Sequence, residues 1–349
     1  MSTAPARRGV VRLSDVVGHD AAVARLRRAA AEDRPASAYL LTGAAGVGKR
    51  TLADAFAARL LCASPADGDA CGTCAQCTRI AAGTHPDLRI VAREEDRRDV
   101  RIEQARELTR WLALRPMMAT RKLAIVDDAD RLNEHGQNAL LKTLEEPPGS
   151  AVVLLVATRA SQLLPTVRSR CQHVRLDALA PDALAAFLAV RGVAADALPV
   201  IVARAAGAPG RALALVDDPE AETRALVLDH LGRLATLLAA DCSSLAQRLG
   251  KSDPVPAMEV VTAWYRDLLA LVLHADAASL RNPDAADALR AAAARTTAEA
   301  VLRQLEAVCD TARALERNAN RVLALETLFL VLRRLERGEA LPPTWTTAP

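Results

Sequence analysis

Residues 43–50 read Gly-Ala-Ala-Gly-Val-Gly-Lys-Arg, a glycine-rich run that ends in a lysine and an arginine. The apolar run 39–42 precedes it and a helical pattern over 51–61 follows, so the glycines lie in a turn from a buried strand to a helix. In such a turn, backbone N–H groups and the helix N-terminus surround nucleotide phosphates, while the lysine reaches the β and γ oxygens. The stretch therefore predicts a phosphate-binding loop (P-loop), with these nucleotide-binding candidates: Gly43, Gly46, Gly48 and Lys49. A glycine turn without a ligand is the alternative.

The position after the lysine departs from the P-loop pattern. A Ser or Thr there supplies the hydroxyl that binds Mg²⁺, whereas this chain has Arg50. Thr51 comes one residue later, rotated by about 100° around the helix, which makes it a poor substitute. A guanidinium beside the metal position would also repel the cation. We therefore expect a site that binds nucleotide weakly or without a productive metal ion.

A pair of acids follows the apolar run 123–126. Asp127 stands where the Walker B arrangement has the carboxylate that holds Mg²⁺. The next position usually carries a glutamate that polarises the attacking water, but here it is Asp128, which is one methylene shorter. Catalysis tolerates displacements of about 1 Å poorly. Because two parts of the hydrolytic machinery are altered in one chain, we expect no ATP hydrolysis by this site.

Four cysteines fall within sixteen residues, with the spacing C-x8-C-x2-C-x2-C: Cys62, Cys71, Cys74 and Cys77. Two overlapping C-x2-C steps bring thiolates to one ion, and the first cysteine can close a tetrahedral, all-thiolate zinc site. Such a closed site is structural. The alternatives are a redox pair or unrelated buried cysteines, and His85 is a rival fourth ligand. Disulfides are not expected, because no export signal is evident in the sequence.

The pattern of the 349 residues predicts an α/β part followed by an all-α part. Five short apolar runs, separated by helix-length segments, are typical of buried parallel strands: 39–42, 88–91, 123–126, 152–157 and 173–176. Beyond residue 177 only helical patterns remain. We predict a P-loop domain over 1–177 with a zinc module at about 62–77, a small helical lid over 178–217, and a helical collar over 218–349.

Composition excludes several classes of protein. The net charge is only +3, so contact with nucleic acid requires a local patch. Eight aromatic residues are too few for a base-stacking platform. The longest stretch without a charge, 35–48, is shorter than the roughly 18 apolar residues of a membrane span. Arginine outnumbers lysine 41 to 4, which we attribute to a GC-rich genome. We expect a soluble, cytoplasmic protein.

Two further motifs join the P-loop and the cysteine cluster. Residues 138–148 read Asn-Ala-Leu-Leu-Lys-Thr-Leu-Glu-Glu-Pro-Pro, and residues 163–172 read Leu-Leu-Pro-Thr-Val-Arg-Ser-Arg-Cys-Gln. Together these motifs resemble the AAA+ subunits of the bacterial DNA polymerase III clamp loader. The resemblance covers about 18–177, and beyond it only the helical pattern of lid and collar agrees.

The resemblance separates two branches of that family. The tau/gamma motor branch keeps an intact Gly-Lys-Thr loop and an Asp-Glu Walker B, whereas the stator branch keeps the zinc module over a decayed ATP site. Arg50 and Asp128 place this chain with the stators. A stator supports ATP-dependent loading of the sliding clamp onto primed DNA, with tau/gamma and delta subunits as partners in the polymerase III holoenzyme. The alternatives are an active tau/gamma-type motor ATPase and a stand-alone P-loop regulator.

The resemblance also implies roles for three residues. Arg170, in the Ser-Arg-Cys motif, corresponds to an arginine that crosses the subunit interface and contacts the γ-phosphate of ATP on the neighbour. A planar, permanently charged donor suits the charge of a transferring phosphoryl group. Arg211 and Thr158 stand where related subunits carry two sensor residues for their own nucleotide. A surface arginine without a role is the alternative for Arg170.

Overall fold

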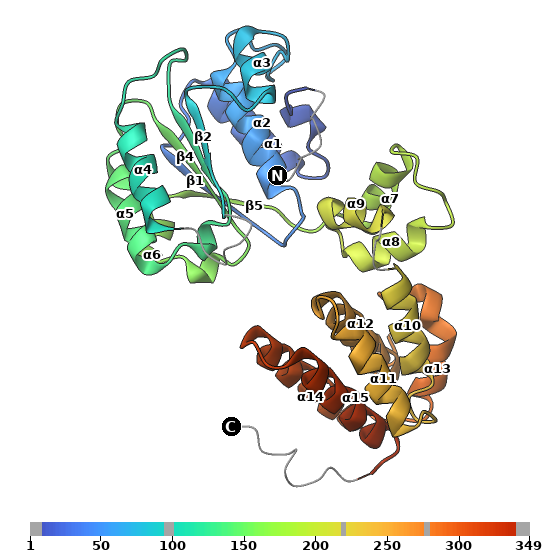
Figure 1. Ribbon diagram of the computed structural model, residues 1–349. Coiled ribbons are helices and arrows are strands. Elements are labelled where there is room, and N and C mark those ends of the chain that lie inside the picture. The colour runs from blue at the N-terminus through green and yellow to red at the C-terminus, as the bar shows by residue number, and fades with distance from the viewer. Residues whose placement is uncertain (1–8, 94–100, 218–220, 276–279, 340–349) are drawn as a thin grey trace. The chain divides into compact units, whose positions relative to one another are not determined.

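The computed structural model describes residues 9–93, 101–217, 221–275 and 280–339 (Figure 1). The chain divides into two units. The first comprises Met1–Phe187 with Gly207–Arg211, and the second comprises Leu188–Ala206 with Ala212–Pro349. Helices α7 (Pro181–Ala189) and α9 (Pro209–Val216) therefore contribute residues to both units. The division into P-loop domain, lid and collar stays a prediction.

A parallel sheet forms the centre of the first unit. Its strands are β1 (Ala38–Thr42), β2 (Leu88–Val91), β3 (Leu123–Val126), β4 (Val152–Ala157) and β5 (Gln172–Arg175). Their order across the sheet is β2-β3-β4-β1-β5, and each neighbouring pair is parallel. The strands were predicted to within one residue at each end, because continuous apolar runs are typical of strands buried on both faces.

Helices cover both faces of the sheet (Figure 1). Tyr39 and Leu41 face a core formed with α1 (Asp20–Ala31) and α2 (Lys49–Leu61). Leu40, between them, faces the opposite core. That core is completed by three helices: α4 (Ile102–Leu112), α5 (Glu134–Glu145) and α6 (Pro165–Arg168). The alternation follows from the two-residue period of a strand. A further short helix, α3 (Ala75–Ala81), lies in the cysteine-rich segment.

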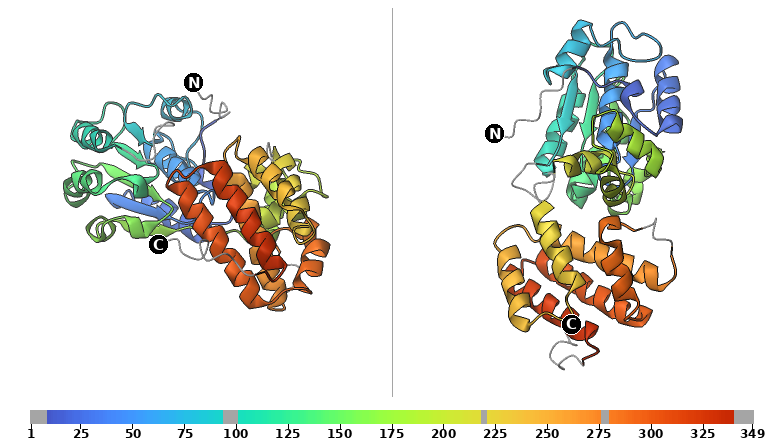
Figure 2. Two further views of the ribbon diagram at one scale, coloured as in Figure 1. Left: turned by 60° about the horizontal axis from the view of Figure 1, so that its bottom comes forward. Right: turned by 90° about the vertical axis from the view of Figure 1, so that its right-hand side faces the viewer.

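The second unit is helical in its described residues. Besides α8 (Leu198–Ala205) it contains α10 (Ala221–Gly232), α11 (Ala239–Leu249), α12 (Val255–Val272), α13 (Ala286–Ala293), α14 (Ala298–Glu316) and α15 (Arg321–Glu336). The buried rings of Trp264, Tyr265 and Phe329 contribute to its core. Figure 2 shows α14 and α15 side by side, as their contacts require. The predicted α/β plus all-α fold class is confirmed. No described helix is long and apolar enough to cross a membrane.

Candidate functional site

The glycine-rich loop joins β1 to α2, as the sequence predicts. Gly48 has φ 106° and caps α2, while Gly43 and Gly46 have φ 149° and 75°. A Cβ atom at Gly43 would lie 2.3 Å from the backbone oxygen of Leu176, so no other residue fits there. The loop thus runs from a buried strand directly into the N-terminus of α2, and a glycine-rich turn in that position is the P-loop context for binding phosphate.

Lys49, the first residue of α2, is turned toward the loop. Its Nζ donates hydrogen bonds to the backbone oxygens of Gly43 (2.8 Å) and Ala44 (2.7 Å) and to Thr158 Oγ1 (3.2 Å). Burial lowers the pKa of Lys49, and the nearby charge of Asp130 acts in the opposite direction. The structure thus brings together two residues proposed for the nucleotide site from positions 109 residues apart.

Arg50 makes the contact that most affects the chemistry of the site. Its Nη1 lies 2.8 Å from Asp127 Oδ2, and its Nε lies 3.0 Å from Asp54 Oδ1. Burial opposes the charge of the guanidinium, but these carboxylates raise the pKa of Arg50 overall. The guanidinium therefore occupies the carboxylate that was expected to hold Mg²⁺. Asp54 was not predicted, although its spacing of four residues from Arg50 on a helix was a usable signal.

The acids after β3 have separate surroundings. Asp128 has φ 50°, and burial together with the charges of Asp127 and Asp130 raises its pKa. Asp130 is buried and accepts hydrogen bonds from the backbone N–H groups of Thr158 (3.2 Å) and Arg159 (2.9 Å). Asp130 thus fixes the end of β4, where Thr158 lies. No sequence pattern predicts this role of Asp130, because it depends on β3 and β4 being neighbours.

The start of α9 lies against the loop within the first unit. The backbone N–H of Gly210 donates to the backbone oxygen of Gly46 at 2.8 Å. Arg211 follows, and its backbone nitrogen lies 2.9 Å from the position of a Cβ atom at Gly46. Thr51 is half-buried at the third position of α2. Both residues therefore lie at or beside the loop.

Arg170 lies in the turn between α6 and β5. Among the described residues, its side chain bonds Thr166 and Glu145 and not the residues that surround Lys49. Its Nη1 donates to the backbone oxygen of Thr166 at 2.9 Å, and its Nη2 forms an ion pair with Glu145. The side chain is 35% exposed and that of Glu145 is 45% exposed. Glu145 stands in the 138–148 motif, but the sequence analysis gave it no role.

The four cysteine sulfurs gather at one point. All lie within 4.8 Å of one another, with separations of 3.6 Å (Cys62–Cys71), 3.9 Å (Cys62–Cys74) and 4.0 Å (Cys71–Cys77). Four thiolates around zinc at about 2.3 Å would be about 3.8 Å apart. The donor set and its spacing therefore fit a tetrahedral metal ion. His85, the rival ligand, instead bonds Gln76 Oε1 at 2.7 Å.

Backbone groups hold the cysteine module in place. Hydrogen bonds from the backbone N–H groups of Thr73 and Cys74 lower the pKa of Cys71 to about 6, which favours its thiolate. Asp69 accepts hydrogen bonds from the backbone N–H groups of Leu13 (2.9 Å) and Ser14 (2.8 Å). The module is thereby attached to the segment that precedes α1.

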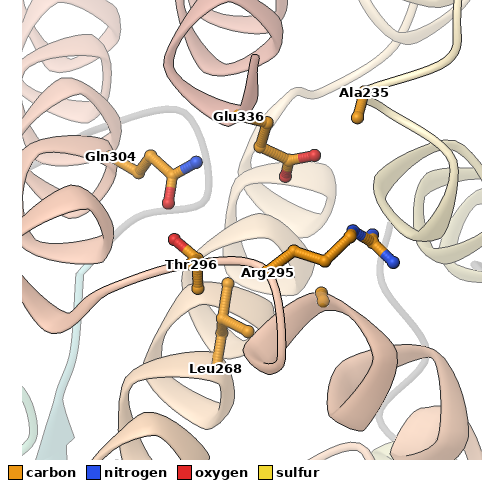
Figure 3. Close-up of a pocket in the computed structure, with 7 residues that line it drawn as sticks. Ala235, Leu268, Arg295, Thr296, Gln304 and Glu336 are labelled. Atoms are coloured by element: carbon orange, nitrogen blue, oxygen red, sulfur yellow. The ribbon is translucent and has the colours of Figure 1, made fainter. Parts of the chain in front are cut away.

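A small pocket lies in the second unit (Figure 3). Its volume of about 20 Å³ suits one water molecule. Glu336 lines it and accepts a hydrogen bond from the buried Tyr265 hydroxyl at 3.2 Å. Burial raises the pKa of Glu336 to about 7. Gln304 Oε1, which is also buried, has no hydrogen-bond partner among the described residues. The pocket is too small for a metabolite.

Comparison with known proteins identifies the family of the chain. Residues 18–180 match the family model "DNA polymerase III, delta subunit", and residues 221–334 match "DNA polymerase III, delta subunit, C terminal". The chain is 35% identical to DNA polymerase III subunit delta' of Pseudomonas aeruginosa, over 84% of this chain and 91% of that protein. It is 34% identical to subunit delta' of Escherichia coli, over 71% and 73%.

The gamma/tau branch matches less completely. The chain is 29% identical to DNA polymerase III subunit gamma/tau of Mycobacterium bovis, over 84% of this chain but only 56% of that protein. Higher identity and nearly full coverage of the P. aeruginosa relative favour the delta' branch. On these matches, the chain belongs to the delta' family of DNA polymerase III clamp-loader subunits.

Proposed function

We propose that this protein is the stator of a sliding-clamp loader. In this role it supports the ATP-dependent loading of the clamp onto primed DNA without hydrolysing ATP itself. The observation that carries the proposal is the ion pair between Arg50 and Asp127, which places a side-chain cation on the carboxylate that a hydrolysing subunit would give to Mg²⁺. Asp128 stands where a motor subunit has its catalytic glutamate.

The nucleotide site would be vestigial, because the phosphate-binding loop is kept while the metal position is altered. The candidates for binding nucleotide are Gly43, Gly46, Gly48, Lys49, Arg50, Thr51, Asp127, Asp128, Thr158 and Arg211. Lys49 and the loop glycines keep the phosphate-binding arrangement, which supports weak binding of nucleotide phosphates. The altered metal position argues against a productive ATP–Mg²⁺ complex in this subunit.

Arg170 supplies the one chemical role that we assign to the stator. We propose that it acts in trans as a catalytic residue, contacting the γ-phosphate of ATP bound to a neighbouring motor subunit. Its side chain is partly exposed at the surface of the first unit, which supports this assignment. A guanidinium in this position stabilises the charge that develops on the transferring phosphoryl group.

The cysteine module would hold a structural zinc ion. The four sulfurs offer a closed set of ligands, so no position is left for a substrate, and the metal would stabilise the loop between α2 and α3. Cys62, Cys71, Cys74 and Cys77 are the proposed ligands.

The proposed partners are the tau/gamma and delta subunits, because curated relatives of this chain include tau/gamma subunits of DNA polymerase III. The helical region 218–349 would form the collar that joins the ring, and 178–217 the lid. The protein would contact the sliding clamp and primer-template DNA as part of the assembled complex. A role in replication supports a cytoplasmic location.

The test is clamp-stimulated ATP hydrolysis by rings rebuilt with Arg170→Ala. We expect assembly to be unchanged and hydrolysis at the adjoining motor site to fall steeply, since arginine fingers contribute about 10³–10⁵ in rate in the best cases. The total loss would be smaller, because only one site of the ring faces this chain. Arg170→Lys should rescue poorly, because a point charge lacks the guanidinium fork.

Arg175→Ala is the matched control, because this nearby side chain is 80% exposed and pairs locally with Asp177. Wild-type rates with Arg170→Ala in fully assembled rings would refute the role of Arg170. Steady-state ATP hydrolysis by the purified chain would instead favour a tau/gamma-type motor.

A further inference from the structure

We propose that Glu145 is the positioning residue of Arg170, holding its guanidinium in the orientation that a neighbour's γ-phosphate requires. The inference rests on the proposed function of Arg170 and goes beyond it, because it assigns a role to a second side chain. The observation is the ion pair between Arg170 Nη2 and the carboxylate of Glu145, which lies 25 residues earlier in the chain.

The two residues come from elements that the core holds together. Glu145 ends α5, and Arg170 follows the last residue of α6 by two positions. Beside them, Leu144 of α5 and Val167 of α6 are buried in the same core cluster. Because the backbone on both sides is fixed by packing, the carboxylate meets the guanidinium at a defined place.

The hydrogen bonds of Arg170 constrain its orientation without using up its donors. Nη1 donates to the backbone oxygen of Thr166, and Nη2 pairs with Glu145. A guanidinium has five N–H groups, two on each terminal nitrogen and one on Nε. Each terminal nitrogen therefore keeps an N–H for an incoming phosphate oxygen. Two anchors from different elements fix the plane of the guanidinium, and catalytic rates are sensitive to displacements of about 1 Å.

The exposure of the pair distinguishes positioning from a contribution to stability. Both side chains are more than a third exposed. Ion pairs of this kind add little to folding free energy, because water screens them and because ordering two long side chains costs entropy. Loss of the Glu145 carboxylate should therefore leave the fold and the ring intact while Arg170 becomes mobile.

The experiment measures clamp-stimulated ATPase of rings rebuilt with Glu145→Ala, with Glu146→Ala as the matched control. Glu146 is the exposed glutamate that follows in the same motif. We expect Glu145→Ala to lower kcat at the adjoining site about tenfold, with KM for ATP unchanged, and Glu146→Ala to have no effect. Glu145→Gln keeps an acceptor oxygen in place and should retain an intermediate rate.

A double variant tests whether Glu145 acts through Arg170 or affects the rate independently of it. If Glu145 acts through Arg170, adding Glu145→Ala to Arg170→Ala should lower the rate no further. Additive losses would overturn the inference, as would an unchanged or increased rate with Glu145→Ala alone. If Arg170→Ala itself has no effect, the proposed role of Arg170 fails; if it lowers the rate while Glu145→Ala does not, the inference about Glu145 fails alone.

Discussion

Replacing Arg50 by threonine restores the residue that a P-loop uses at this position and frees the carboxylate of Asp127. In the wild-type protein, Arg50 Nη1 lies 2.8 Å from Asp127 Oδ2. A magnesium ion held by that oxygen at about 2.1 Å would lie at most about 5 Å from the guanidinium nitrogen. At the dielectric constant of water, the repulsion between the two cations is about 1.7 kcal/mol, equivalent to about 15-fold in Mg²⁺ affinity.

The assay is the binding of a fluorescent ATP analogue to the purified full-length chain, with Mg²⁺ or with EDTA. We expect Mg²⁺ to change the affinity of the wild-type protein little and to raise that of Arg50→Thr by about 15-fold or more. Adding Asp127→Asn to Arg50→Thr is the control, and it should abolish the response to magnesium. Hydrolysis should stay absent in all variants, because Asp128 is unchanged.

The same substitution has a small effect on stability. Arg50 is paired with Asp54 as well as Asp127, but its side chain is 31% exposed, so we expect a loss of about 1 kcal/mol in the free energy of unfolding. The variant therefore remains folded under the conditions of the binding assay. Equal responses to Mg²⁺ in the wild-type and Arg50→Thr proteins would refute the reasoning that the guanidinium displaces the metal.

Two further outcomes can be measured on the isolated protein. Metal analysis should find about one zinc per chain, and Cys74→Ser should release it and lower the free energy of unfolding by several kcal/mol, since metal binding is coupled to local folding; substoichiometric zinc in protein purified without chelators would contradict this. Burial raises the pKa of folded Glu336 to about 7 from a usual 4.5, so the folded state keeps a proton that the unfolded state loses between these values. The free energy of unfolding should therefore fall by up to about 3 kcal/mol as pH rises from about 4.5 to about 7 and level off above it. Urea titrations across this range should show a weaker fall for Glu336→Gln, and an identical fall in both proteins would contradict the assignment.

Local sequence patterns were enough to predict the strands, the glycine-rich loop and the cysteine cluster. Continuous apolar runs gave the five strands, because a strand buried on both faces has no polar side. The glycine spacing at 43–48 predicted the loop, since residues that carry a Cβ atom rarely adopt the positive φ angles found there. The cysteine spacing gave the cluster at Cys74 and its neighbours, because ligands a few residues apart converge with little help from the rest of the chain.

Which charged groups contact one another depends on the packing of elements that are distant in the sequence. Arg50 reaches Asp127 across 77 residues because the parallel order of the sheet brings the end of β3 and the start of α2 to the same edge. Asp130 reaches the end of β4 for the same reason. The pairing of Arg170 with Glu145 requires α5 and α6 to share a core. Arginine is abundant in this chain and its side chain is long, so local sequence does not specify its partner; the packing of distant elements does.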